Sequence, residues 1–155
     1  MMSSSLVLDM LLPVWVSLKL AGVTTLCLLV FATPLAYWLA RPSRGHIVGR
    51  IKIMLMGVIA MPLVLPPTVI GFYLLLLLSP NFGVGKWLLQ YNISAFIFTF
   101  EGLVIGSIIY SLPFFVQPVY AQFLRIPISV MEVASLLEPS RFRRFIRVAL
   151  PQARI

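Results

Sequence analysis

The chain has 155 residues, of which 61% are hydrophobic and only 10% are charged, and its mean hydropathy is +1.04. This composition excludes a soluble domain with an ordinary polar surface and is typical of a protein that crosses a membrane several times. The formal net charge is +8, but the basic residues gather between apolar segments, which disfavours nucleic-acid binding. A single cysteine, Cys27, excludes a disulfide framework.

Three apolar segments are long enough to cross a bilayer, whose hydrocarbon core requires roughly 20 apolar residues per helix. They cover residues 11–39, 53–78 and 95–120. We therefore predict an all-α, polytopic membrane region over residues 1–121 and a separate polar segment over residues 122–155. The first segment has no basic leader and is longer than the core of a signal peptide, so we interpret it as a retained membrane helix.

Positive charge is concentrated on one side of these three spans. Ten of the twelve lysine and arginine residues follow the first or the third span: Arg41, Arg44, Arg50, Lys52, Arg125, Arg141, Arg143, Arg144, Arg147 and Arg154. Because basic loops usually stay in the cytoplasm, this pattern predicts an N-terminus outside the cell and a cytoplasmic segment 122–155.

The second apolar segment contains the sequence MPLVLPPTVIG, with three prolines in six residues. Pro62, Pro66 and Pro67 lack an amide hydrogen, and their rings clash with the preceding helical turn. The pattern predicts a kink or a short non-helical break within the second span. With Gly71, these prolines form either a packing kink or a hinge that lines a pore.

Two further features of the spans have both a structural and a functional interpretation. Lys19 lies about two turns inside the first apolar segment, where its ammonium group could extend to the interface or attract an anion. Gly102 and Gly106 form a GxxxG pair in the third segment, a spacing that permits close approach of another helix.

The segment after the third span has the pattern of a helical hairpin. Ser129 as N-cap, with Glu132 three residues later, predicts a first helix over residues 128–137. The dipeptide Glu138-Pro139 interrupts this helix, because a residue before proline is pushed out of the helical region. Ser140 can cap a second helix that runs through Ala149.

The second helix is amphipathic, and Leu150-Pro151 is expected to end it. Its apolar stripe consists of Phe142, Phe145, Ile146 and Ala149, and arginines occupy most of the remaining face. Three interpretations fit this arrangement: a helix held at the interface by anionic membrane lipids, a nucleic-acid-binding helix, and a docking surface for a protein partner. The second is the weakest, because basic clusters beside membrane spans usually reflect topology.

Residues 132–151 resemble the cytoplasmic-loop motif of ABC-importer permeases, written Glu-Ala-Ala, three residues, Gly, nine residues, Ile, any residue, Leu-Pro. Four positions match, two are mild replacements and one departs from the motif: Glu132, Ala134, Leu150 and Pro151, then Val133 and Val148, then Glu138 in place of glycine. Glutamate adopts a positive φ only at a cost, so this departure is expected to alter the turn.

The stretch MPLVLPPTVIGFYLLLLL is similar to a segment of molybdate permeases, with sulfate/thiosulfate permeases as close relatives. The resemblance implies part of a type I ABC-importer permease fold and import of an oxyanion, molybdate or tungstate first, with sulfate or thiosulfate as the alternative. It also implies that the chain lies in the bacterial inner membrane and is non-catalytic, since the partner ATPase uses the ATP.

Several partners are implied by the same resemblance. They are a second copy of the permease, a periplasmic or lipid-anchored oxyanion-binding protein, and a cytoplasmic ATPase. The ATPase would contact the coupling-loop residues Glu132, Val133, Ala134, Glu138, Arg141, Phe142, Phe145, Val148, Leu150 and Pro151.

The chain ends four residues after the motif, whereas family members continue with further helices, so it resembles a C-terminally truncated permease. The competing interpretation is therefore a truncated, non-transporting membrane interaction protein. Neither a catalytic site nor a metal site is predicted. The Gly-Lys pair at 85–86 follows Pro80 where a P-loop requires glycine, and the sole histidine, His46, has no neighbouring metal ligands.

Overall fold

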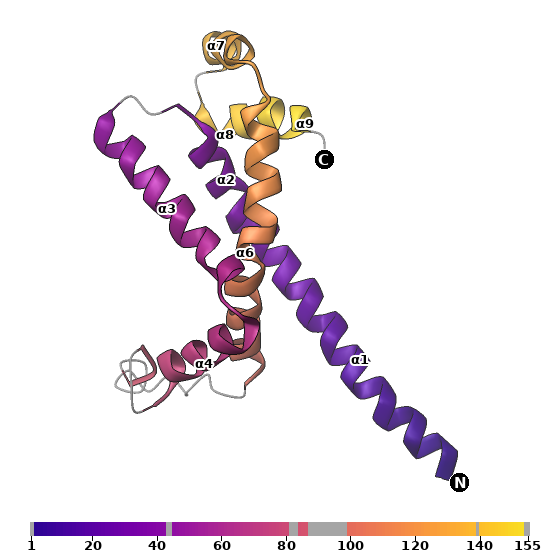
Figure 1. Cartoon of the computed structure of the whole chain (residues 1–155). Helices are drawn as coiled ribbons and strands as arrows, with labels where there is room; N and C mark the ends of the chain where they lie inside the picture. Colours follow the sequence, from indigo (N-terminus) through magenta and orange to yellow (C-terminus); the bar gives the residue numbers. More distant parts are fainter. Residues whose placement is uncertain (1, 43–44, 81–83, 87–98, 139, 154–155) are drawn as a thin grey trace. The chain divides into compact units, whose positions relative to one another are not determined.

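The computed structural model describes residues 2–42, 45–80, 84–86, 99–138 and 140–153, and the side chains among them from residue 11 onward. The principal elements of this part of the chain are all helical, and it contains no strand. In chain order they are α1 (Met2–Cys27), η1 (Leu28–Ala32), α2 (Thr33–Ala40), α3 (His46–Val64), α4 (Pro67–Leu78), α6 (Phe100–Leu124), α7 (Ile128–Leu137), α8 (Arg141–Arg144), η2 (Phe145–Ala149) and α9 (Leu150–Gln152) (Figure 1). The predicted all-α class is confirmed.

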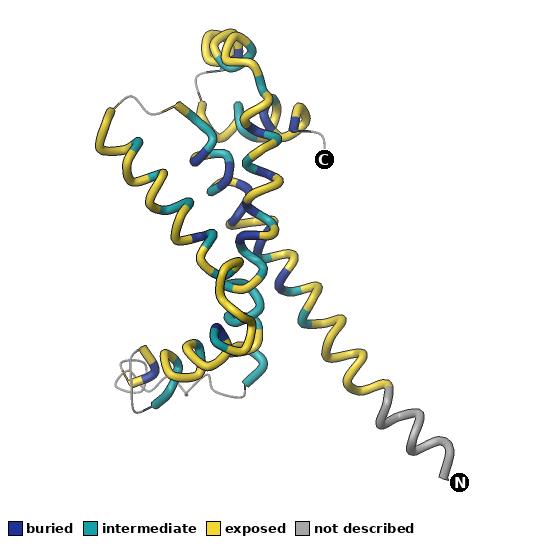
Figure 2. The backbone as a smooth tube through the Cα atoms, viewed as in Figure 1, coloured by how far each residue is buried: buried dark blue, intermediate teal, exposed yellow. Residues whose placement is uncertain are grey.

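Three helical stretches have the length and apolarity to cross a membrane: Leu11–Ala40, His46–Val64 and Phe100–Leu124. At most 17% of the most apolar part of each stretch is buried inside the chain, so their apolar side chains need a non-aqueous environment. Figure 2 shows this exposure along α3 and along the part of α1 whose side chains are described. The chain is a multi-pass membrane protein.

The helix bounds differ from the predicted spans most clearly in the second span. The predicted range 53–78 is divided between α3 and α4, because the chain leaves the helical conformation at Leu65 and Pro66. Pro66 has an extended ψ of 141°, and Pro67 begins α4 at a position where its missing amide hydrogen costs nothing. With 12 residues, α4 is too short to cross a bilayer alone. Pro62, by contrast, is accommodated inside α3.

The other two bounds shift by a few residues. The first helical stretch passes through a π-helical turn, η1, and reaches Ala40. α6 extends four residues beyond the predicted end at 120, and residues 95–98 of the predicted third span lie outside the described residues. Arg44, Pro139 and Arg154 also lie outside them.

The chain divides into two compact units, which we describe one at a time. The first comprises residues 1–27 and 65–110, and the second comprises residues 28–64 and 111–155. In the second unit, small and aliphatic residues of η1, α2 and α6 are buried: Leu28, Ala32, Ala36, Leu39, Val116 and Val119. Alanines at this spacing present little side chain, which lets another helix approach closely.

Candidate functional site

The predicted hairpin is present at the end of the second unit. α7 spans the predicted residues 128–137 and lies beside the helical segment formed by α8, η2 and α9 (Figure 1). The predicted cap Ser129 is wrong, because the helix begins at Ile128 and its N-cap is Pro127, two residues before Ser129. Pro127 has φ −58°, already suited to a helix start, and its carbonyl accepts a hydrogen bond from the Val130 amide at 3.1 Å.

The second helical segment is longer than predicted, since it passes through Leu150-Pro151 and reaches Gln152. A π-helical turn precedes the proline, and in it the Leu150 amide donates to the Phe145 carbonyl five residues back. This wider turn changes the hydrogen-bond register just before Pro151, which has no amide hydrogen of its own. Ser140 is at the predicted N-cap position with extended backbone, but its side chain makes no capping hydrogen bond.

Glu138 lies at the turn between the two helices and has φ −131° and ψ 102°. This is extended backbone that any residue adopts, so the expected cost of glutamate in place of glycine is absent here. The Glu138 amide donates to the Ala134 carbonyl at 3.0 Å and closes the last turn of α7.

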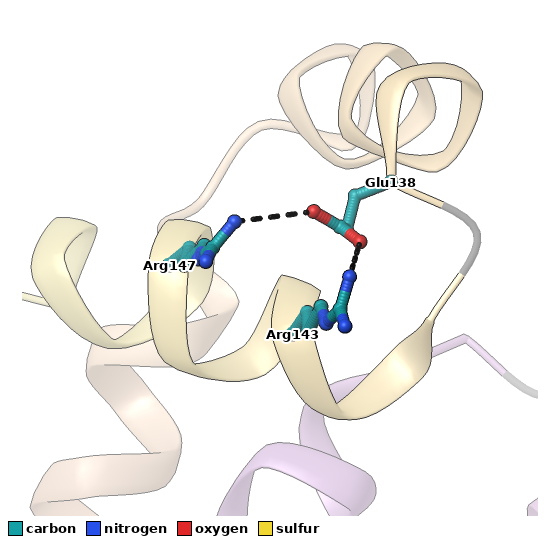
Figure 3. A network of polar contacts seen from close by, with 3 residues as sticks. All are labelled: Glu138, Arg143 and Arg147. Atoms are coloured by element: carbon teal, nitrogen blue, oxygen red, sulfur yellow. Dashed lines mark ion pairs between the residues drawn. The ribbon is translucent and has the colours of Figure 1, made fainter.

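The Glu138 carboxylate pairs with two arginines of the following helix (Figure 3). Its Oε1 lies 3.6 Å from a guanidinium nitrogen of Arg143, and its Oε2 lies 3.6 Å from one of Arg147. The two arginines are four residues apart and therefore lie on the same helix face. We call these three side chains the Glu138 network.

An aromatic cluster connects the second helix to the membrane helices of the same unit. Phe145 lies 4.9 Å from Tyr37 of α2 and 6.2 Å from Phe123 of α6, between ring centroids, and Tyr37 lies 5.2 Å from Phe123. Phe123 is buried and Phe145 is half-buried. We call Tyr37, Phe123 and Phe145 the aromatic cluster.

Only part of the predicted apolar stripe faces inward. Ala149 is fully buried and Val148 is half-buried, whereas Phe142 and Ile146 remain 70% and 44% exposed. Sequence reasoning did not assign Tyr37 or Phe123 to the site. Their aromatic character was visible, but nothing in the local pattern indicates which distant helix an aromatic ring contacts.

α7 presents most of its surface outward, as Figure 2 shows. Of the predicted coupling residues, Ala134 packs inward and Glu132 and Val133 are exposed. Leu136 and Leu137, which the prediction did not include, are 85% and 80% exposed. Arg141, Leu150 and Pro151 on the second segment are exposed as well. The structure thus brings together exposed leucines of α7 and exposed arginines of α8 and η2 on the hairpin.

The predicted hinge residues are not all in one place. Pro67 and Gly71 line an apolar groove of about 450 Å³ between α4 and α6 in the first unit, together with Ile70, Leu74, Leu75, Leu78, Gly102, Leu103, Gly106, Ser107 and Tyr110. Pro66 precedes the groove at the start of α4, and Pro62 lies within α3. A Cβ atom added to Gly106 would lie 3.6 Å from Leu74 Cδ1, an ordinary van der Waals distance, so Leu74 of α4 lies beside Gly106 of α6.

Two basic side chains lie against the C-terminal end of α2 in the second unit. The Lys52 ammonium donates a hydrogen bond to the Arg41 carbonyl at 2.6 Å and lies 4.9 Å from the centre of the Trp38 ring. The Arg41 guanidinium lies 4.9 Å from the centre of the Tyr37 ring. Aromatic rings and basic groups of this kind are typical of a membrane interface. Within the described residues, no group of three or more histidine, cysteine or acidic side chains could hold a metal.

The chain matches the family described as binding-protein-dependent transport system inner membrane component over residues 20–155. It belongs to this family. It is 45% identical over 138 residues to the molybdenum transport system permease protein ModB of Azotobacter vinelandii, covering 89% of this chain and 59% of that protein. This membership confirms the predicted resemblance to ABC-importer permeases.

Two other relatives widen the comparison. The ModB of Haemophilus influenzae is 35% identical, with 79% of this chain and 53% of that protein covered. The sulfate transport system permease protein CysW of Escherichia coli K12 is 32% identical, with 94% of this chain and 48% of that protein covered. The chain thus spans about half the length of these relatives.

Proposed function

We propose that the chain is a membrane-spanning permease subunit of an ATP-driven importer for an oxyanion, molybdate or tungstate. The family and the identity to two ModB permeases support the transport role and the substrate class. The subunit is non-catalytic and conveys the motion of a partner that hydrolyses ATP. Its further partners are a second permease copy and a periplasmic or lipid-anchored oxyanion-binding protein.

The hairpin of α7, α8, η2 and α9 is the docking surface for the cytoplasmic ATPase. The observation that supports this most directly is the contrast between its two sides. One side exposes the adjacent apolar side chains of Leu136 and Leu137, and contact of such side chains with water is unfavourable unless a partner covers them. The other side is fixed to α2 and α6 through the aromatic cluster. A rigid hairpin of this kind can transmit a partner's movement to the membrane helices.

The membrane in this proposal is the bacterial inner membrane. Ten of twelve basic residues follow the first or third span, which supports a cytoplasmic hairpin and an N-terminus outside. The break at Leu65 and Pro66, with Pro67 and Gly71 on the apolar groove, is the proposed hinge. A short helix beside a break can reorient without disrupting hydrogen bonds inside a long helix.

The test is co-purification of the tagged chain with its ATPase from native membranes, for the wild type and for Glu132→Lys. Glu132 is exposed on α7, so reversal of its charge changes the docking surface without disturbing a core. We expect stoichiometric ATPase with the wild type and loss of at least tenfold with the variant. Molybdate uptake in a permease-null strain should fall in parallel. Unchanged ATPase recovery with Glu132→Lys would reject the docking surface.

Sulfate is the second candidate substrate, because the CysW relative covers 94% of the chain at 32% identity. A competition experiment with labelled molybdate distinguishes molybdate from sulfate as the substrate. Excess unlabelled sulfate should leave molybdate uptake unchanged if the chain serves molybdate, and should abolish it if both anions share the pathway.

A further inference from the structure

Glu138 is the one acidic side chain among the described residues that forms an ion pair, and both of its carboxylate oxygens are engaged. The carboxylate is 23% exposed, whereas the side chains of Arg143 and Arg147 are 65% and 71% exposed. The acidic side chain is therefore less exposed than either of its two cationic partners. Partial burial strengthens the attraction relative to that of a fully exposed pair.

The network joins two elements that are otherwise linked by a three-residue turn. Glu138 follows the last residue of α7, while Arg143 is in α8 and Arg147 is in η2. The second element is already held by Phe145, which lies between the two arginines in sequence and contacts Tyr37 and Phe123. The network thus extends this fixed region to the C-terminal end of α7.

The exposed leucines are at that same end. Leu136 and Leu137 immediately precede Glu138, and their large exposed fractions mean that few contacts of their own restrain them. The described contacts that hold Glu138 are the hydrogen bond from its amide to the Ala134 carbonyl and the two ion pairs of its side chain.

We propose that Glu138 is a positioning residue: its paired contacts with Arg143 and Arg147 set the orientation of the Leu136–Leu137 end of α7 relative to the helix that the aromatic cluster holds. The role of this orientation in ATPase docking rests on the function proposed above. The orientation itself can be measured in the chain without the ATPase. The orientation of α7 and the binding of the ATPase can therefore be tested separately.

The first experiment uses spin labels on Ser135 of α7 and Gln152 of α9, both exposed, in the full chain with Cys27→Ser. The distance distribution between the labels is measured by double electron–electron resonance. Glu138→Gln keeps the size of the side chain and removes its charge. We expect the distance distribution of Glu138→Gln to be at least twofold broader than that of the wild type. Addition of 0.5 M salt should also broaden the distribution of the wild type, because salt screens the ion pairs.

Two further variants show whether the effect is due to pairing. Glu101→Gln removes an equal charge from the first turn of α6 and should leave the distribution unchanged. The triple exchange Glu138→Arg, Arg143→Glu, Arg147→Glu restores opposite charges and should narrow the distribution again. A distribution that is the same for wild type and Glu138→Gln would overturn the proposal, as would failure of the triple exchange to narrow it in a chain with native helix content.

ATPase co-purification is then measured for the same variants. A threefold to tenfold loss with Glu138→Gln, reversed by the triple exchange, is expected if positioning serves docking. If the wild type itself recovers no ATPase while the label distances respond as described, the proposed function fails and the positioning role of Glu138 stands.

Discussion

The ring of Phe145 packs against the ring of Tyr37, with the two centroids 4.9 Å apart and the ring planes inclined by 48°. Phe145 belongs to the hairpin and Tyr37 to α2, a membrane helix. This contact, completed by Phe123 of α6, joins the hairpin to two membrane helices within the second unit. It makes the aromatic cluster the first place to test how rigidly the hairpin is held.

Phe145→Ala removes a partner from two other rings, and we expect it to lower the free energy of unfolding by roughly 1–3 kcal/mol. Tyr37→Phe is the matched control. The Tyr37 hydroxyl oxygen is buried and forms no hydrogen bond with any described residue, so its removal should change stability by no more than about 0.5 kcal/mol, or increase it. Thermal unfolding in mild detergent compares the two. Equal losses for both variants would mean that the hydroxyl, not the ring contact, stabilises the cluster.

Leu136→Ser combined with Leu137→Ser tests the exposed end of α7. Because both side chains are at least 80% exposed, we expect helix content and unfolding temperature to stay near wild-type values. ATPase recovery should fall at least tenfold, since the proposed interface loses its apolar contacts. Ile128→Ser, which replaces another exposed apolar side chain by serine at the opposite end of α7, provides the control. If it reduces recovery as much as the double variant, the contact is not confined to the leucine end.

The break before α4 is tested by Pro66→Ala combined with Pro67→Ala. These changes restore amide hydrogens and allow α3 to continue into α4 as one helix. Helix content should rise, and molybdate uptake should fall at least tenfold if the break acts as a hinge. Pro62→Ala, inside a helix that is already continuous, should leave uptake within about twofold. If the double variant takes up molybdate as fast as the wild type does, the break is not a hinge and serves helix packing only.

Gly106 tests the groove between α4 and α6. An added Cβ would lie at an ordinary van der Waals distance of 3.6 Å from Leu74 Cδ1, so Gly106→Ala should keep or slightly raise the unfolding temperature. Gly106→Leu projects further into the groove and should lower the unfolding temperature by several degrees. Gly71→Leu is the matched control, because among the described residues no atom outside its chain neighbours and its own helical turns lies within 4 Å of a Cβ built there. Equal effects at both glycines would contradict a close helix approach specific to Gly106.

Local sequence chemistry accounts for most of the helices. The bounds of α7 follow from Pro127 before it and Glu138-Pro139 after it, and the break before α4 follows from the prolines at 66 and 67. Prolines act on the backbone within one turn, so their effect can be derived without knowledge of distant residues. The apolar runs likewise predicted a chain that crosses a membrane, although the lengths of individual helices differed by several residues.

The arrangement of the candidate site depended on tertiary structure. From sequence, Glu138 was a departure from a motif with an expected backbone cost, whereas the structure gives it extended backbone and two arginine partners. Tyr37 and Phe123 precede Phe145 by 108 and 22 residues and meet it only in the folded chain. Sequence by itself determined the all-helical, membrane-crossing character of the chain and its proline breaks, because these follow from local backbone limits and from the transfer energies of apolar runs. Contacts between distant side chains depend on how helices pack, so only the tertiary structure decided which residues hold the hairpin in place.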